Sequence, residues 1–317
     1  MKRIQYHHYG RPEELRLEEA KQPDPERGQI RVRVRAAAAN PMDWKIRRGE
    51  MRMLSGFRFP RGLGHDFAGV VEAVGPGVER LKAGDEVLGV TSINKAGAFA
   101  EFLVADEKNA ALKPSSISFE QAAALTLVSV TAWNALVAKA KLRAGQSVFI
   151  TGCLGGVGRS AVQIARMLGA DVAGSCSASG REEALALGVG EVVDYRAFNI
   201  APYRHRFDVV FDTAGALSLS QCGAMLKRRG MSLHIVPTPA KLIGCLLPSR
   251  HHLVFGNPTP ECMAGIAEAA ERGKLVPAIG RIAPLSEAIS AIVELEMTGS
   301  PKGKLVIVPR VPPKISC

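Results

Sequence analysis

The stretch from Gln146 to Gly158 constrains the fold more than any other part of the chain. Ser147–Thr151 is a short apolar run of strand-forming residues, a glycine-rich segment comes next, and Val157–Leu168 has helical periodicity. This order predicts a strand, a tight turn and a helix. Backbone N–H groups at such a helix start can receive a phosphate, and glycine lets a pyrophosphate approach the main chain.

The turn departs from the full dinucleotide-binding pattern of three glycines. Gly155 and Gly158 match its second and third glycines, and Cys153 stands in place of the first. An ordinary tight turn is the alternative. A P-loop is disfavoured by Cys153 and by Arg159, which stands where that loop needs lysine. The segments after the turn favour a βαβ unit, with strand, helix and strand predicted at Asp171–Ser175, Glu182–Leu187 and Glu191–Tyr195.

The end of the second strand of this unit predicts which nucleotide binds. An NAD site usually has an acidic residue there, which accepts from the ribose 2′-OH. Ser175–Gly180 contains no carboxylate, and Arg181 follows it. Hydroxyl groups and a guanidinium bind a 2′-phosphate, so NADP(H) is favoured over NAD(H). The alternative is that Arg181 is a solvated residue paired with Glu182 or Glu183.

Length and composition set the class of protein. The 317 residues suffice for two domains, and a hydrophobic content of 47% can fill their cores. No run approaches the roughly 18 uninterrupted apolar residues of a membrane span, and the start of the chain lacks the pattern of a signal peptide. We therefore expect a soluble, cytoplasmic protein with no membrane partner. The scattered cysteines, which lack metal-ligand spacing, are expected to be free thiols.

The net charge of +11 raises the question of nucleic-acid binding. The basic residues are spread along the chain, as in the alternating Arg31, Arg33 and Arg35, and Lys227–Arg229 is expected at a helix end, where the helix dipole favours cations. We therefore expect no nucleic-acid partner, although part of the charge attracts an anionic cofactor.

The remaining segments predict two domains of an α/β protein. Residues 1–117 are expected to form a small antiparallel, barrel-like domain with strands at Ile30–Ala36, Gly69–Val74, Glu86–Val90 and Ala98–Ala105. A helix at Phe119–Val137 then begins an alternating pattern. Further strands are expected at Val209–Ala214, Ser232–Val236, Leu253–Gly256 and Lys304–Val308, and helices at Leu217–Leu226, Pro260–Glu271 and Leu285–Met297.

Several short segments, in this order and spacing, resemble the medium-chain dehydrogenase/reductase superfamily, in its zinc-independent quinone oxidoreductase and enoyl reductase branch. They are Ala39–Trp44, Gly64–Val71, Gly84–Val87, Gly97–Glu101, Thr131–Trp133, the glycine turn, Asp194–Arg196 and Gly303–Val306. The resemblance implies a GroES-like catalytic domain (1–117 and 259–317) and a Rossmann domain with a doubly wound parallel sheet (118–258). It also implies an active site between the two domains and a homodimer.

Other branches of the family hold a catalytic zinc through Cys, His and Cys. Asn40 stands where their first cysteine does, the region Ser129–Trp133 contains no cysteine, and only His65 survives, beside Asp66. One imidazole does not hold Zn²⁺, which takes three protein ligands in a catalytic site. We therefore expect no metal, and expect a hydrogen-bonded His65 whose carboxylate neighbour fixes its tautomer. A site made of Asp43, His65 and Asp66 is the open alternative.

The resemblance also implies which residues contact the cofactor. It places Gly155, Gly156 and Val157 on the pyrophosphate, Ser175, Ser177, Arg181 and Tyr195 around the 2′-phosphate, Gly215 by the nicotinamide ribose, and Phe255, Asn257 and Lys304 more loosely near the cofactor. Asn40 and Thr131 are the candidates for positioning the nicotinamide and substrate. Three of these residues have a structural alternative: Asn40 is a turn residue before proline, Thr131 bonds its own helix, and Tyr195 packs on the sheet.

Hydride transfer to an already electrophilic carbon needs no metal. The family resemblance therefore implies NADPH-dependent reduction of a quinone or of an activated C=C bond in an enone or enal. The sequence does not identify the group that donates the proton. A zinc-type alcohol dehydrogenase and a non-catalytic NADPH-binding protein are the alternative functions.

Overall fold

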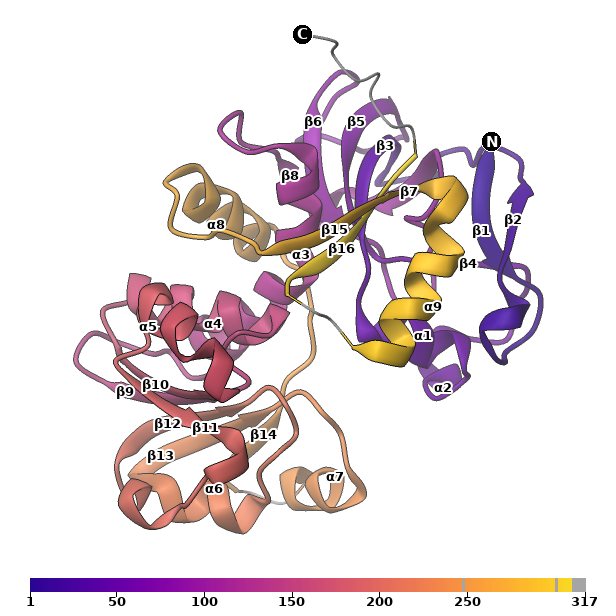
Figure 1. The fold of residues 1–317 in the computed structure, drawn as a ribbon. Coiled ribbons are helices and arrows are strands. Elements are labelled where there is room, and N and C mark those ends of the chain that lie inside the picture. The colour runs from indigo at the N-terminus through magenta and orange to yellow at the C-terminus, as the bar shows by residue number, and fades with distance from the viewer. Residues whose placement is uncertain (247–248, 300–301, 310–317) are drawn as a thin grey trace, which may run out of the picture. The chain divides into compact units, whose positions relative to one another are not determined.

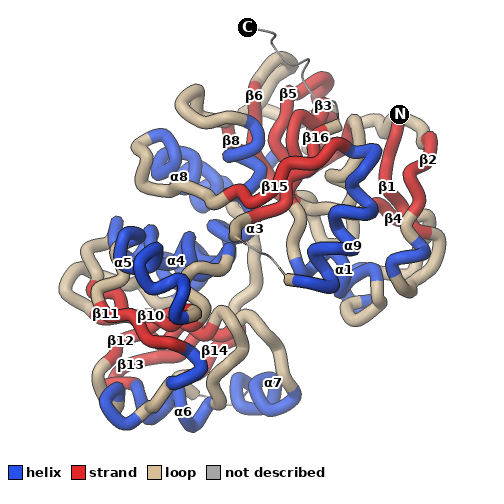
Figure 2. The backbone as a smooth tube through the Cα atoms, viewed as in Figure 1, coloured by secondary structure: helices blue, strands red, loops and turns tan. Residues whose placement is uncertain are grey.

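A computed structural model describes residues 1–246, 249–299 and 302–309, and the chain divides into two compact units (Figures 1 and 2). Unit 1 contains Met1–Leu127 and the chain from Pro258 onward, and unit 2 contains Val128–Asn257. The predicted boundaries lie ten residues earlier at the first junction and one residue later at the second. The first junction differs because helix α3 (Phe119–Trp133) begins in unit 1 and ends in unit 2.

Unit 2 is built on a parallel sheet whose strand order is β11-β10-β9-β12-β13-β14 in the described residues. The strands are β9 (Ser147–Thr151), β10 (Asp171–Cys176), β11 (Glu191–Asp194), β12 (Phe207–Asp212), β13 (Leu226–His234) and β14 (His251–Leu253). Figure 1 shows α4 (Gly156–Met167) and α5 (Arg181–Leu187) on one face, and α6 (Leu219–Met225) and α7 (Pro239–Leu246) on the other. The chain winds outward from β9 to β11 and returns to β12, so the strand order reverses at β9. The predicted doubly wound sheet is confirmed.

Burial on both faces explains why β9 is an unbroken apolar run. Val148, Phe149 and Ile150 are all fully buried, as expected for a central parallel strand covered by helices. The ring of Phe149 lies 5.7 Å from that of Tyr203 and 5.3 Å from that of Phe207. These contacts fasten β9 to the segment that enters β12.

The structure corrects the end of helix α6. The sequence predicts a helix through Leu226 with Lys227–Arg229 at its end, but Leu226 has extended dihedrals and pairs with Phe207, so Lys227–Arg229 lie in strand β13. Gly230 packs against the Phe207 carbonyl, where an added Cβ would lie 2.8 Å from its oxygen. This close strand contact explains why the chain is extended there.

Unit 1 contains two sheets in its described residues. A small sheet has the order β2-β1-β4, and a larger one has the order β15-β16-β3-β5-β6-β8, with β7 also paired to β3. The strands are β1 (Lys2–Tyr6), β2 (Arg16–Glu19), β3 (Gln29–Ala38), β4 (Arg61–Gly62), β5 (Asp66–Val74), β6 (Glu86–Val90), β7 (Phe102–Asp106), β8 (Ala110–Leu112), β15 (Ile279–Pro284) and β16 (Lys304–Val308). The pairing is antiparallel except between β15 and β16. The sequence patterns did not predict β1, β2, β4, β8 and β15, because these strands are short or poorly alternating.

Four α-helices lie wholly within the described residues of unit 1. They are α1 (Pro41–Arg47), α2 (Arg52–Ser55), α8 (Pro260–Glu271) and α9 (Ala288–Thr298). Arg47 of α1 donates to both carboxylate oxygens of Glu296 in α9 at 2.7 Å, and both side chains are buried. This ion pair fastens the C-terminal helix to the N-terminal part of the chain, and Figure 1 shows α9 beside α1.

Helix α3 continues through a π-helical segment, Asn134–Lys139. Over Phe119–Lys139 it is the one described helix that is long and apolar enough to cross a membrane, and 72% of its most apolar window is buried inside the protein. A core helix of a folded domain has the same properties. The five described cysteines are free thiols, and Cys317 lies outside the described residues.

Candidate cofactor and catalytic sites

The glycine turn of unit 2 leaves the first backbone N–H groups of α4 without intrahelical acceptors. Gly155 is the N-cap residue and provides no side chain to satisfy them. Gly152 has a φ of +58°, which reverses the chain after β9. A Cβ on Gly158 would lie 2.1 Å from the Gly152 carbonyl oxygen, so the helix begins directly against the turn. This arrangement fits a diphosphate held by the N–H groups that begin at Gly156 and Val157.

Cys153, in the place of the first glycine of the pattern, is fully buried. It fits because its neighbour in β10 is Gly174, where an added Cβ would lie 2.9 Å from the Cys153 Cβ. Burial raises the pKa of the Cys153 thiol to about 12, so the thiol stays protonated near neutral pH. Cys153 is a packing residue. The space for its side chain is provided by Gly174 in the adjacent strand.

Two predicted serines lie where β10 ends. Ser175 is buried, and its Oγ accepts from the Gly152 N–H at 3.4 Å, so it supports the turn itself. Ser177 begins the next short helical turn, and its hydroxyl bonds that of Ser179 at 3.1 Å. The two hydroxyls at 177 and 179 form a polar corner immediately before α5.

Arg181 and Tyr195 flank the same corner. Arg181 donates from Nη1 to the Val192 carbonyl of β11 at 2.7 Å, and in the described residues Glu183 pairs with Arg159 instead of Arg181. Tyr195 follows β11 with 52% of its surface exposed, so it does not pack into the sheet. The structure thus brings Ser177, Arg181 and Tyr195 to the carboxyl ends of adjacent parallel strands.

The remaining predicted residues of unit 2 are more dispersed. Gly215 follows β12 with a φ of +71°. Phe255 is 59% exposed after β14, and the carbonyls of Phe255 and Asn257 accept from Asn134 Nδ2 at 3.2 and 2.8 Å. Thr131 is 8% exposed and lies on α3, a different element from those that form the corner around Arg181.

The sequence reasoning missed a buried charged cluster at the ligand-binding edge of the sheet. Asp212 at the end of β12 accepts from Lys241 Nζ at 2.6 Å and from Thr151 Oγ1 at 2.8 Å, and His234 Nδ1 lies 3.6 Å from its carboxylate. Asp212 and His234 are fully buried, and Lys241 is 3% exposed. No local pattern relates Lys241 in α7 to Asp212, so only the fold could reveal this pair.

The cluster keeps Asp212 ionised. Burial alone would raise its pKa, but the nearby His234 and the hydrogen bonds from Lys241 and Thr151 outweigh burial and lower the pKa below its usual range. Asp212 also accepts from the backbone N–H groups of Ala216 and Leu217. The carboxylate therefore fixes the loop after β12, which contains Gly215, and the start of α7.

A second buried network lies in unit 1 and joins three distant segments. The Asn40 amide donates to Asp66 Oδ2 at 2.8 Å, while its oxygen accepts from Lys304 Nζ. Lys304 Nζ also lies 3.4 Å from Asp66 Oδ2, and Asp66 Oδ1 accepts from the Leu127 N–H at 2.7 Å. Burial raises the pKa of Asp66, while Lys304 and Asn40 act in the opposite direction. Two predicted site residues, Asn40 and Lys304, therefore contact each other directly.

His65 lies beside this network, but its partner is not the adjacent Asp66. Its Nδ1 lies 2.8 Å from Asp43 Oδ1, and the other oxygen of Asp43 accepts from the Asn40 N–H at 2.8 Å. Asn40 is the N-cap of α1. It therefore has both the turn role before Pro41 and the buried amide contacts. The predicted carboxylate contact thus exists, with Asp43 in place of Asp66.

This donor set does not fit a zinc ion. His65 Nε2 is the one imidazole nitrogen here without a hydrogen-bond partner, while Asp43 is used by His65 and Asp66 by Lys304. The Lys304 ammonium adds a positive charge beside the carboxylate. Among the described residues no group of three or more His, Cys, Asp or Glu side chains is arranged to hold a metal ion.

Comparison with known proteins agrees with the fold. The family described as alcohol dehydrogenase GroES-like domain matches residues 26–115, and that described as zinc-binding dehydrogenase matches residues 187–307. The chain is 32% identical to a chloroplast envelope quinone oxidoreductase homolog of Arabidopsis thaliana, covering 90% of this chain and 92% of that protein. It is 33% identical to an NADPH-dependent alkenal/one oxidoreductase of the same plant, covering 98% and 80%.

A solved structure extends this likeness to three dimensions. The quinone oxidoreductase of Coxiella burnetii aligns with a TM-score of 0.85 at 30% identity, over 98% of this chain and 99% of that one. A GroES-like unit and a Rossmann unit with a glycine-rich turn after its first strand define a nicotinamide-dependent oxidoreductase. The chain belongs to the medium-chain dehydrogenase/reductase family, among the relatives of the quinone oxidoreductases.

The close contact at Gly158 predicts a specific sensitivity. In Gly158→Ala the new methyl group overlaps the Gly152 carbonyl, so the start of α4 must move. The first N–H groups of the helix then no longer point toward the proposed diphosphate. We expect nicotinamide cofactor affinity, measured by fluorescence titration, to fall at least about tenfold, which corresponds to ~1.4 kcal/mol. Gly190→Ala is the control, because its Cβ would make an ordinary 3.5 Å contact. Equal affinity in both variants would contradict the proposed role of the turn.

The Asp212 cluster predicts a pH-dependent stability difference. Asp212→Asn leaves Lys241 buried without a carboxylate, and we expect a loss of about 3 kcal/mol in unfolding free energy at neutral pH. A carboxyl group whose pKa is lowered by folding contributes stability above its unfolded pKa of about 4 and loses it as the pH falls below that value. The urea midpoints of wild type and variant should therefore converge below about pH 4. Exposed Asp171→Asn should show little difference at any pH, and a pH-independent gap for Asp212→Asn would refute this account.

Proposed function

We propose that the protein uses NADPH to reduce quinones or activated C=C bonds of enones and enals, without a metal ion. The observation that carries the proposal is the Asn40–Asp66–Lys304 network, whose hydrogen bonds engage Asn40, the residue that the family resemblance aligns with the first zinc-ligating cysteine of other branches. The names of the two Arabidopsis relatives support the substrate class. A homodimer, which the family resemblance implies, and a cytoplasmic location, which the sequence pattern suggests, are part of the same proposal.

Reduction without a Lewis acid suits substrates that are already electrophilic. Bound NADPH supplies a hydride, which reduces the β-carbon of an enone or enal, and a proton must reach the α-carbon or the oxygen. The negative charge that develops on oxygen needs a hydrogen-bond donor. Lys304 has an N–H beyond those directed to Asn40 and Asp66, and we propose it as that donor, with Asn40 fixing the position of the ammonium.

The corner after β10 supports NADPH over NADH. Ser177, Ser179 and Arg181 supply hydroxyl groups and a guanidinium, and β10 ends in Cys176 without an acidic residue. Asp194 of β11 lies opposite Cys176 in the strand pairing. Its carboxylate accepts from the Arg196 N–H at 3.0 Å and so caps its own turn. Hydrogen bonds from such donors favour a 2′-phosphate over a 2′-hydroxyl.

A panel assay separates this proposal from its alternatives. We expect loss of NADPH absorbance with p-quinones, with enals or with both, and none with simple saturated aldehydes. The rate should be unchanged by a zinc chelator. Stoichiometric zinc in the purified protein together with alcohol oxidation would favour a zinc-type alcohol dehydrogenase. Tight NADPH binding without turnover on either panel would favour a non-catalytic NADPH-binding protein.

Arg181 provides a test of coenzyme choice. In Arg181→Gln the guanidinium is lost, and we expect KM for NADPH to rise about tenfold to a hundredfold, since a hydrogen bond to a charged group contributes ~1.5–3 kcal/mol. KM for NADH should change little, because NADH has no 2′-phosphate. Arg204→Gln, an exposed change on the loop before β12, is the matched control. A parallel rise of KM for both coenzymes would show that Arg181 is not a 2′-phosphate ligand.

A further inference from the structure

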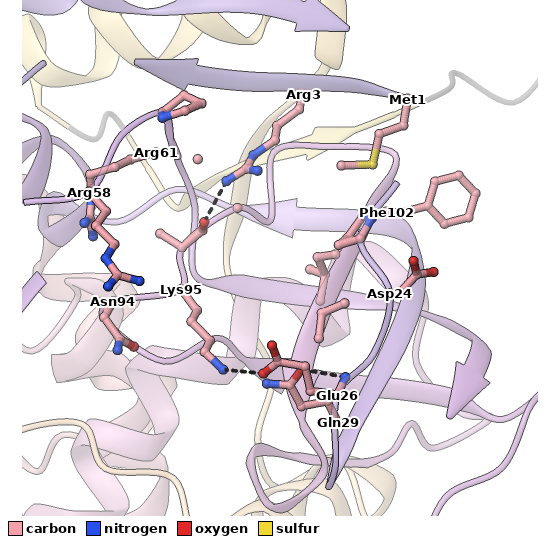
Figure 3. A pocket seen from close by; sticks show the side chains of 17 residues that line it. Met1, Arg3, Asp24, Glu26, Gln29, Arg58, Arg61, Asn94, Lys95 and Phe102 are labelled. Carbon is pink, nitrogen blue, oxygen red and sulfur yellow. Dashed lines mark hydrogen bonds and ion pairs between the residues drawn. The ribbon is translucent and has the colours of Figure 1, made fainter. Parts of the chain in front are cut away.

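Unit 1 contains a surface cavity of about 360 Å³. None of the residues proposed for the reaction lines it. Its wall is formed by β1, by β7, by the segment that leads into β4, and by the loops around residues 24–29 and 94–97. Figure 3 shows Arg3 and Arg61 on its upper side, Arg58 and Asn94 at the left, and Lys95 with Glu26 below. The volume lies within the range of pockets that hold small metabolites.

Among the charged side chains that line the cavity, the ones without an ion-pair partner are positive. Arg3, Arg58 and Arg61 line it, and none of the three forms an ion pair with a carboxylate in the described part of the chain. Of the two carboxylates in the wall, Asp24 is paired with Arg31 at 2.9 Å, and Glu26 lies 3.9 Å from Lys95. The three guanidinium groups are therefore not neutralised by the protein.

Two of these arginines are held inside the wall with unused donors. Arg61 is 7% exposed, and its Nε has no hydrogen-bond partner; the Nε of Arg3 is likewise buried and unpartnered. Burial lowers the pKa of the Arg3 guanidinium, as expected for a buried cation without a counter-charge. Buried donors without protein partners are rare in folded proteins, and a bound ion is one of their explanations.

The backbone is shaped around Arg3. Its Nη2 donates to the Ala96 carbonyl at 3.3 Å, as drawn in Figure 3. A Cβ on Gly62 would lie 2.3 Å from the same nitrogen, and one on Gly97 would lie 3.3 Å from it. Glycine at both positions gives the guanidinium the space it occupies, so its placement is built into the wall.

From this geometry we propose that the cavity is a binding site for a small phosphate-bearing metabolite, with Arg3 and Arg58 as its principal ligands. A guanidinium presents paired N–H donors that match the oxygens of a phosphate, and several such groups suit a dianion better than a monoanion. The site belongs wholly to unit 1 and shares no residue with the glycine turn of unit 2. It is therefore additional to the cofactor site.

The cavity is connected by backbone to the polar network of unit 1. Gly97 donates its N–H to the Gly64 carbonyl at 2.9 Å, and Gly64 precedes His65. Arg61 and Gly62, which line the cavity, begin the same segment that ends at Asp66. A ligand in the cavity thus contacts the chain that leads directly to His65.

Calorimetric titration with inorganic phosphate tests the site. The full chain is first saturated with NADPH, so that the glycine turn does not bind the probe. We expect a single phosphate site in the wild type, and Arg58→Gln and Arg3→Gln should each weaken it at least about tenfold. Arg58 is exposed, so its replacement leaves folding intact even if Arg3→Gln does not. Arg27→Gln, an exposed neighbour outside the cavity, is the matched control and should bind as wild type does.

Three results would overturn the proposal. They are no saturable phosphate binding by the wild type, the same affinity in Arg58→Gln as in wild type, and equal weakening by Arg27→Gln, which would indicate only diffuse attraction to positive charge. Arg181→Gln separates the two sites, because that change should leave phosphate binding in the cavity unaltered. Failure of the protein to bind NADPH would count against the proposed function and leave the comparison of the arginine variants fully interpretable.

Discussion

The start of α4 lies so close to the end of β9 that position 158 has no room for a side chain, and the rest of unit 2 depends on this contact. It fixes the direction of the first N–H groups of the helix, which we propose as ligands of a diphosphate. The adjacent strand adapts to it as well. Cys153 occupies a position that usually requires glycine, and Gly174 supplies the missing space from β10. The turn and the adjacent strand need a small residue between them, and that residue can stand in either segment.

Each unit adds a buried carboxylate that ties together segments far apart in the chain. Asp212 joins the ends of β9 and β12 to α7 through Thr151 and Lys241, and Asp66 joins Asn40 to Lys304. Ionised groups in such places need counter-charges and hydrogen bonds, because burial strongly disfavours an isolated charge. These networks therefore fix geometry more than they add stability. In unit 1 the network also takes up the donors that a metal ion would need.

Local sequence patterns predicted the strands and helices of the Rossmann unit well, because apolar runs bounded by glycine depend on neighbouring residues. The prediction failed at Lys227–Arg229, which form part of β13 because Leu226 pairs with Phe207 across the sheet. It also missed Lys241, since its partner lies 29 positions away and no periodicity connects them. The predicted partner of His65 was the adjacent Asp66, but alternation along β5 directs that side chain elsewhere, and Asp43 takes its place.

The sequence alone determined the alternation of strands and helices in the Rossmann unit, the glycine-rich turn and the lack of the zinc-ligating cysteines of related branches, because each is a matter of residue type and short spacing. The tertiary structure alone decided which distant residues meet. Asn40 meets Lys304, Asp212 meets Lys241, and Arg3 lies beside Gly62 and Gly97 only once distant strands have paired. Contacts of this kind arise from the packing of whole sheets, so no local pattern records them.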